Sequence, residues 1–166
     1  MAVRGSTCSE AAMTEIRFRG TVPMPRTEVF DYFVDARLWP AWFPGVEAVD
    51  DIEGWGAPGG RCRLTVRVLG RRRTFHCQMT KIDRPQLFAY VAREEGLPTS
   101  SHEGRFVEVA EGTRVEISAR RDPRRGPAGF YDRIVVARAL KRMMDRSMAS
   151  LATTLTERRR RASGST

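Results

Sequence analysis

Residues 22–46 read VPMPRTEVFDYFVDARLWPAWFPGV and decide the fold, because they join a strand end to a short helix and an aromatic cluster. Pro25 suits the first turn of a helix, where its missing N–H leaves no hydrogen bond unmade. The apolar residues that share one face of this helix are Val29, Phe30 and Phe33. Asp35 can cap a further short turn. We therefore predict two short helices directly after an opening strand.

The aromatic cluster of this stretch consists of Trp39, Trp42 and Phe43, with prolines breaking the chain around it. Such rings usually fill a core, but they can also floor a pocket. Both interpretations stay open for Trp42 at this point, whereas Phe30 and Phe33 are predicted to be core.

Periodicity in the rest of the chain predicts a run of strands and one long helix. The strands are expected over residues 14–22, 45–53, 61–69, 72–82, 86–94, 101–110 and 113–121. Apolar residues at three- and four-residue steps predict an amphipathic helix over residues 129–157. We expect residues 1–13 to be a disordered extension, residues 14–157 to form one domain, and residues 158–166 to be a basic flexible tail.

Hairpin closure assigns the strand residues to two faces. We place the hairpin turns at Gly70-Arg71 and Glu111-Gly112. The opposed pairs are then Val66 with Phe75, Met79 with Tyr90, Lys81 with Phe88, and Phe106 with Ile117. The apolar face consists of Val66, Val68, Phe75, Met79, Phe88, Tyr90, Phe106, Val115 and Ile117. The polar face consists of Arg63, Arg67, His76, Gln78, Arg114 and Glu116.

Composition limits the classes of function. The chain has 166 residues, which suits one domain, and a formal net charge of +9 carried almost wholly by arginine. This charge admits an acidic partner or nucleic acid, but it bears on solubility rather than on fold, and nucleic acid is the less expected of the partners. No apolar run approaches the roughly 20 residues of a membrane-spanning helix. The three cysteines fit reduced thiols in a cytoplasm, and our register places Cys62 and Cys77 diagonally, too far apart for a disulfide.

Polar side chains on the predicted apolar face are the candidates for chemistry. Tyr90 lies mid-strand, His102 can act as an acid or base near neutral pH, and Arg121 lies at a strand end of the same face. The other polar residues of this face are Arg73, Lys81 and Glu108. Lys141 lies in the apolar stripe of the long helix, where it can reach an acidic ligand group. The sequence contains no phosphate-binding glycine loop and only 2 histidines, so we expect neither a metal nor a cofactor.

Five motifs in their order and spacing resemble the helix-grip superfamily of START-like and Bet v 1-like (SRPBCC) proteins, including its bacterial polyketide cyclase/dehydrase and lipid-transport group. They are VPMPRTEVFDYFVD, RLWPAWFPGV, IDRPQLFAY, EGTRVEI and the closing LATTLTERR, and they span about residues 14 to 157. The resemblance implies an α+β helix-grip fold, with a curved six- to seven-stranded antiparallel sheet wrapped around a long C-terminal helix. One feature departs from the family, which often caps its first helix with Ser, Thr or an acid, because Met24 precedes the helix here.

The resemblance also implies a cavity between the sheet and the long helix. The residues expected to bind a ligand there are Trp42, Phe43, Val66, Phe75, Met79, Phe88, Tyr90, Phe106, Val115, Ile117, Phe130, Ile134, Ala137, Lys141 and Met144. We expect a cytoplasmic monomer or homodimer that binds a hydrophobic small molecule, such as a lipid, a quinone or a polyketide-like compound. The resemblance implies, as the alternative, a polyketide aromatase/cyclase that polarises carbonyls with Tyr, His or Arg of the cavity, and the candidate catalytic residues are then Tyr90, His102 and Arg121. A weaker alternative is association with nucleic acid or the ribosome through the basic surface.

Overall fold

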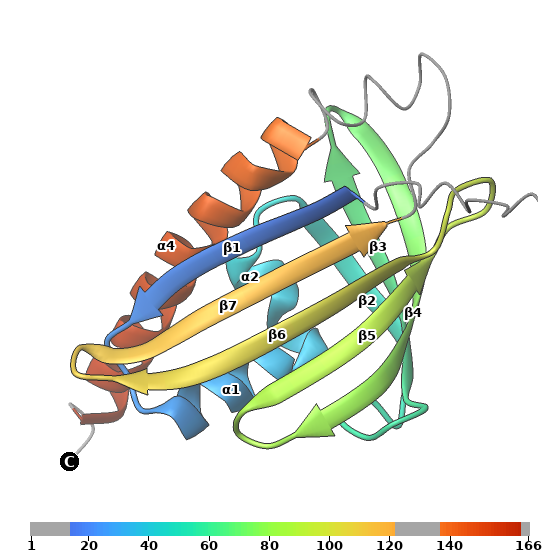
Figure 1. Ribbon diagram of the computed structural model, residues 1–166. Helices are drawn as coiled ribbons and strands as arrows, with labels where there is room; N and C mark the ends of the chain where they lie inside the picture. Colours follow the sequence, from blue (N-terminus) through green and yellow to red (C-terminus); the bar gives the residue numbers. More distant parts are fainter. Residues whose placement is uncertain (1–13, 122–136, 164–166) are drawn as a thin grey trace, which may run out of the picture.

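A seven-stranded antiparallel sheet curves around one long helix (Figure 1). The structure is a computed structural model that describes residues 14–121 and 137–163. The strands are β1 (Thr14–Val22), β2 (Val46–Glu53), β3 (Arg61–Val68), β4 (Arg71–Asp83), β5 (Leu87–Arg93), β6 (Ser100–Val109) and β7 (Gly112–Arg121). Their order across the sheet is β1-β7-β6-β5-β4-β3-β2. Each hairpin neighbour in sequence is therefore a neighbour in space, and β1 closes onto β7. The expected helix-grip architecture is confirmed.

Two short helical segments and one 3-10 turn connect β1 to β2, as predicted. They are α1 (Arg26–Val34), the 3-10 turn η1 (Ala36–Leu38) and α2 (Trp39–Trp42). Pro25 precedes α1 without a side-chain cap, in agreement with the missing cap noted in the sequence. Asp35 caps η1 by accepting a hydrogen bond of 3.2 Å from the backbone N–H of Arg37. The Arg37 guanidinium also donates to both carboxylate oxygens of Asp35, at 2.8 and 3.0 Å.

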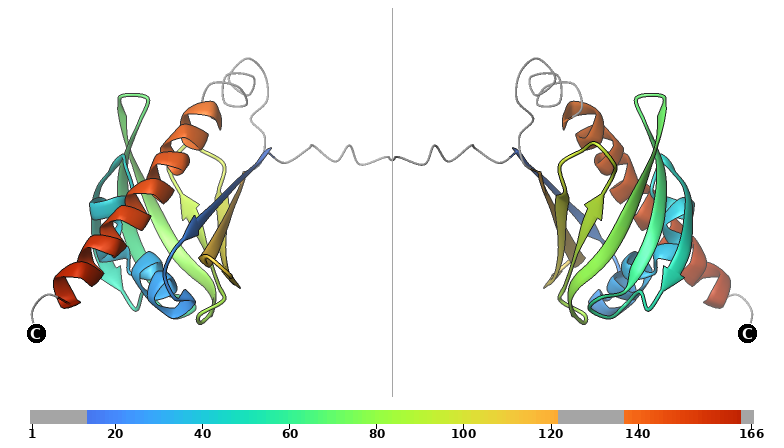
Figure 2. Two further views of the ribbon diagram at one scale, coloured as in Figure 1. Left: turned by 90° about the vertical axis from the view of Figure 1, so that its left-hand side faces the viewer. Right: turned by 90° about the vertical axis from the view of Figure 1, so that its right-hand side faces the viewer.

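The long C-terminal helix, α4 (Ala137–Ser163), lies along the open side of the curved sheet. In Figure 2, β1 and β7 stand on one flank of α4 and β3 and β4 stand on the other. The helix continues six residues beyond the expected end at Glu157, so the segment predicted to be a basic flexible tail is helical through Ser163. The helix that we predicted to begin at residue 129 falls partly outside the described residues.

The register of the β3–β4 hairpin differs by two residues from the predicted one. Leu64, rather than Val66, opposes Phe75, and the turn residues are Leu69 and Gly70. Both turn residues have positive φ, 50° for Leu69 and 77° for Gly70, as a tight two-residue hairpin requires. The β6–β7 hairpin shows the same difference, since Phe106 opposes Val115 rather than Ile117.

A register difference of two residues keeps every side chain on its predicted face. Met79 and Tyr90 are opposed as predicted, and both are buried. Arg67 and His76 are exposed on the opposite, convex face. The assignment of the two faces is therefore confirmed, although most opposed pairs are not.

Lys81 is the exception on the apolar face. An irregularity in the β4–β5 ladder after Met79 places Ile82, instead of Lys81, opposite Phe88. A bulge of this kind adds one residue to a strand and reverses the facing of those that follow. Lys81 is consequently exposed, and its predicted position on the concave face is wrong.

The two described cysteines, Cys62 and Cys77, lie directly opposite each other in the β3–β4 ladder, and not diagonally. Both are buried free thiols. The hydrogen bond with Cys62, followed by burial, raises the pKa of the Cys77 thiol far above its ordinary value. The two-residue change in register explains why the predicted diagonal placement is wrong.

Aromatic rings join α1 to the concave face of the sheet. The rings of Phe30 and Phe106 meet edge to face with centroids 5.1 Å apart. Phe33 contacts both Phe88 and Phe106, with centroids 5.5 Å from each. Phe30 and Phe33 are thus core residues, as predicted.

None of the helices within residues 14–121 and 137–163 has the length and apolar character that a membrane span requires. In the same residues, no group of three His, Cys, Asp or Glu side chains is placed to hold a metal ion. His76 and His102 lie on opposite faces of the sheet, which separates them as predicted.

Candidate ligand-binding site

A cavity of about 420 Å³ lies against the concave face of the sheet. Its walls come from β1, β3 to β7, the α1–α2 segment and Met143 of α4. The apolar lining residues are Ile16, Phe18, Phe33, Trp39, Trp42, Phe43, Leu64, Val66, Val68, Leu69, Phe75, Phe88, Tyr90, Ala92, Leu97, Ile117, Ala119 and Met143. The polar ones are Arg71, Arg73, Ser100, His102, Glu103 and Arg121.

Indole rings from the segment between α1 and β2 form part of the cavity wall. Trp42 is 1% exposed and packs against Phe33, with ring centroids 4.7 Å apart. Trp39 is also buried, and its indole N–H donates a hydrogen bond of 2.8 Å to the carbonyl oxygen of Phe33. Trp39 and Trp42 are therefore both packed as core, and both also face the cavity.

A stack of parallel rings occupies the floor of the cavity. The Tyr90 ring lies 4.7 Å from the His102 ring with 5° between their planes, and 5.9 Å from Phe88 with 9° between planes. Tyr90 and Phe88 point the same way from β5, and His102 is the cross-strand partner of Tyr90 on β6. The strand period and the ladder therefore create the stack directly.

Burial fixes the protonation states of this stack. Burial raises the pKa of the Tyr90 hydroxyl well above its ordinary value, with a smaller contribution from the neighbouring cysteines, so the hydroxyl stays protonated. Burial, and secondarily the positive charge of Arg121, lowers the pKa of His102 to about 4. The imidazole is thus neutral near neutral pH. The cavity therefore presents uncharged hydrogen-bonding groups at Tyr90 and His102.

Ser100 holds the His102 ring in place. The Ser100 hydroxyl lies 3.0 Å from Nε2 of His102 and 3.4 Å from the carbonyl oxygen of Ala92. Ser100 is itself buried, and it opposes Arg121 in the β6–β7 ladder. The Ser100 hydroxyl donates to the carbonyl oxygen of Ala92, and its oxygen can accept from a protonated Nε2 of His102, so Ser100 connects His102 to the sheet backbone.

Three arginines contribute positive charge to the cavity wall: Arg71, Arg73 and Arg121. Arg73 forms an ion pair with Glu94, in which its Nη1 lies 3.0 Å from the carboxylate. Arg71 is exposed beside the tip of the β3–β4 hairpin. This part of the wall can attract the polar or acidic portion of a ligand.

The structure places most described members of the predicted ligand-binding set in the cavity wall. These are Trp42, Phe43, Val66, Phe75, Phe88, Tyr90 and Ile117, and the candidate catalytic residues Tyr90, His102 and Arg121 line the same cavity. Three others, Met79, Phe106 and Val115, are buried core residues outside the lining. Phe130 and Ile134 lie outside the described residues, as do the side chains of Ala137 and Met144.

Two predicted polar positions and one helical lysine are not in the cavity. Lys141 is exposed and pairs with Asp145 at 3.2 Å, so its predicted place in the apolar stripe is wrong. Glu108 is exposed and lies 3.5 Å from Arg26. Lys81 is exposed because the β4 bulge after Met79 turns it away from the apolar face.

Sequence reasoning missed Ser100 and Trp55. The predicted strand begins at residue 101, directly after Ser100, although the i,i+2 spacing of Ser100 to His102 places both on one face. Trp55 lies in a glycine-rich loop, residues 54–60, that the sequence marks only as a break. A large aromatic residue inside such a loop was the available signal.

Comparisons with known proteins agree with this geometry. The chain resembles the crystal structure of the ZhuI aromatase/cyclase from Streptomyces sp. R1128, with a TM-score of 0.76 and 21% identity over 93% of this chain and 100% of that one. It also resembles a protein from Thermus thermophilus, with a TM-score of 0.73 and 18% identity over 84% of this chain and 95% of that one. A START superfamily protein from Mycobacterium smegmatis gives a TM-score of 0.66 and 13% identity, over 87% and 97% of the two chains.

These likenesses, at such low identity, show a shared fold. The sequence matches none of the curated proteins. The family model described as polyketide cyclase/dehydrase and lipid transport matches residues 13–156, which is nearly the whole domain. The chain therefore belongs to the polyketide cyclase/dehydrase and lipid transport family.

Proposed function

We propose that this protein binds a hydrophobic small molecule, such as a lipid, a quinone or a polyketide-like compound, in the cavity between the sheet and α4. The observation that carries the proposal is the cavity itself. Its volume of about 420 Å³ falls within the range of roughly 300–1,000 Å³ that is usual for ligand sites. Aromatic and aliphatic side chains form most of its wall, so an apolar ligand gains free energy by leaving water.

The polar groups of the wall indicate how such a ligand lies. Tyr90 keeps its proton and can donate a hydrogen bond, and neutral His102 can donate or accept one. Both groups suit a carbonyl or hydroxyl oxygen of the ligand. The apolar part of the ligand then packs against Phe33, Trp39 and Trp42.

Native mass spectrometry of protein purified without detergent tests the proposal directly. We expect a bound species of small mass, released under denaturing conditions, and binding of 1-anilinonaphthalene-8-sulfonate to the emptied protein. A protein that carries no small molecule and does not bind this probe would refute ligand binding in the cavity.

Replacement of Tyr90 tests the orientation of the ligand. Tyr90→Phe removes one hydrogen-bond donor and should weaken binding of the co-purified molecule by about tenfold, which corresponds to one ordinary hydrogen bond. Tyr32→Phe is the matched control, because Tyr32 is buried in α1 and does not line the cavity. Equal affinities of the two variants would remove Tyr90 from the binding site.

A second candidate function is that of an aromatase/cyclase. The observation that favours it is the presence of Tyr90, His102 and Arg121 in one cavity wall, where they could polarise a ketone. Incubation with a poly-β-keto substrate separates the two functions. We expect binding without cyclisation. Turnover by the wild type that falls by about 10²–10³ in Tyr90→Phe or His102→Ala would make cyclisation the function.

A further inference from the structure

The loop between β2 and β3, residues 54–60, places one indole ring against the back of the cavity wall. Trp55 contacts two lining residues. Its ring centroid lies 5.6 Å from that of Trp39, with the two rings nearly perpendicular, and 5.8 Å from that of Tyr90. Trp55 itself is half-buried and does not line the cavity. It therefore forms a second layer, between solvent and the two rings that face the ligand space.

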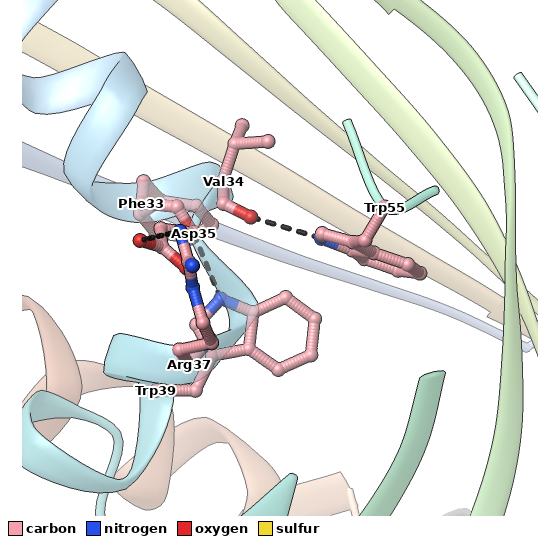
Figure 3. Close-up of polar contacts among 6 residues, drawn as sticks. All are labelled: Phe33, Val34, Asp35, Arg37, Trp39 and Trp55. Carbon is pink, nitrogen blue, oxygen red and sulfur yellow. Dashed lines mark hydrogen bonds and ion pairs between the residues drawn. The ribbon is translucent and has the colours of Figure 1, made fainter. Parts of the chain in front are cut away.

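The position of Trp55 is fixed by the end of α1. Its indole N–H donates a hydrogen bond of 2.9 Å to the carbonyl oxygen of Val34, and Trp39 donates to the preceding carbonyl, that of Phe33. Figure 3 shows both indoles directed toward this helix end. The last carbonyls of a helix have no partner within it, so the two rings satisfy groups that α1 leaves free.

The loop that carries Trp55 is also tightly closed. A Cβ at Gly60 would collide with the carbonyl group of Gly54, so only glycine permits this approach. Gly54 has a positive φ of 58°, a backbone conformation that residues other than glycine rarely adopt. The backbone on both sides of Trp55 therefore makes a close turn that depends on glycine at Gly54 and Gly60.

We propose that Trp55 sets the length of ligand that the cavity accepts, by supporting Trp39 and Tyr90 from behind. This inference rests on the proposed function, because a length limit exists only if the cavity binds an apolar ligand. Loss of the indole removes the support of both rings. Trp39 and Tyr90 can then move outward, and the cavity extends into the vacated volume.

Displacement of 1-anilinonaphthalene-8-sulfonate by saturated fatty acids, from octanoate to stearate, measures the limit. In the wild type, affinity should rise about fourfold with each methylene that is buried and then stop rising when the cavity is full. In Trp55→Ala the rise should continue for several further methylenes. Trp55→Phe keeps an aromatic ring in place, so its affinity should stop rising at the same fatty-acid chain length as in the wild type.

Ile52→Ala is the matched control for the loop. Ile52 lies on β2 just before the loop, is 38% exposed and does not line the cavity, so its plateau should equal that of the wild type. If Trp55→Ala gives no cooperative thermal unfolding, Trp55→Leu provides the comparison, with a plateau between those expected for the wild type and for the alanine variant.

The outcomes separate this inference from the proposed function. A plateau at one chain length in the wild type, Trp55→Ala and Trp55→Leu would overturn the role of Trp55 and leave ligand binding intact. A plateau that moves equally in Ile52→Ala would also overturn it. No dependence on chain length in any of the proteins, with no binding of the probe, would refute ligand binding itself.

Discussion

The imidazole ring of His102 lies parallel to the phenol ring of Tyr90, with centroids 4.7 Å apart and an angle of 5° between the planes. The two residues are direct cross-strand partners in the β5–β6 ladder. Burial in the cavity wall, and secondarily the positive charge of Arg121, lowers the pKa of the imidazole to about 4. A titratable group thus lies in the wall of an apolar cavity in its neutral form.

The half-buried, neutral His102 makes the folded protein sensitive to acid. Its pKa is about 4 in the folded state against 6.5 for an unperturbed histidine, so the unfolded chain binds the proton more readily. The stabilisation is fully present above about pH 6.5 and is lost as the pH falls toward about 4. We expect the free energy of unfolding to fall over this window by on the order of 2 kcal/mol from His102 alone.

Urea unfolding followed by circular dichroism, over this pH range, checks the prediction. His102→Gln lacks the titrating group and should lose this part of the pH dependence, although carboxylates will still contribute at the acid end. Parallel pH profiles for the wild type and His102→Gln would contradict a neutral imidazole in the cavity wall.

The β3–β4 turn offers a stabilising substitution. Leu69 adopts a positive φ of 50°, which costs an ordinary residue roughly 1 kcal/mol. Leu69→Asn creates an Asn-Gly turn, the sequence that two-residue hairpins of this type prefer. We expect Leu69→Asn to raise the melting temperature by a few degrees. Leu69→Val should lower it, because β-branched valine tolerates a positive φ least well. A lower melting temperature for the asparagine variant would contradict the turn geometry.

Substitution of Gly104, on the concave face, should instead destabilise the protein. Its cross-strand partner is Phe88, and a Cβ at Gly104 would collide with the Phe88 ring. Gly104→Ala should therefore destabilise the protein by about 1–3 kcal/mol, as overpacking of a core does, and alter probe binding because Phe88 lines the cavity. Ser101→Ala, on the exposed face of the same strand, should change neither. Chemical denaturation and probe titration of both variants measure the effect.

The thiols of Cys62 and Cys77 should be inert in the folded protein. Both are buried, and the mutual hydrogen bond and burial raise the pKa of Cys77, so little thiolate forms at neutral pH. We expect peptide mapping after native treatment with iodoacetamide to show these two cysteines unmodified, and after unfolding to show both alkylated. Native alkylation at the rate of the unfolded chain would contradict the buried, opposed pair.

Much of the fold follows from the sequence because face assignment depends only on the two-residue period of a strand. The errors in register arose at turns: the prediction places the β3–β4 turn at Gly70-Arg71, whereas Leu69 and Gly70 form it. Leucine rarely adopts a positive φ, so the sequence carries no signal for a turn at Leu69. Strand pairing and side-chain packing outweigh this local cost. The β4 bulge after Met79 has no comparable local signal, because it depends on how β5 pairs.

The candidate site was predictable to the same degree. Residues such as Tyr90 and His102 were identified because they interrupt apolar faces of strands. Trp55 could not be placed in this way, since its position depends on the carbonyl of Val34 at the end of another element. Contacts between a loop and a helix end have no periodicity in sequence.

The arrangement of the indole rings has a spectroscopic consequence. The chain has 3 tryptophans, and all of them gather at this cavity: Trp39 and Trp42 line it, and Trp55 lies against its wall. Near-ultraviolet excitation at the red edge of protein absorbance therefore excites fluorophores from one small region of the molecule. The intrinsic emission is a built-in indicator of whether that region is filled or empty, with no label added to the protein.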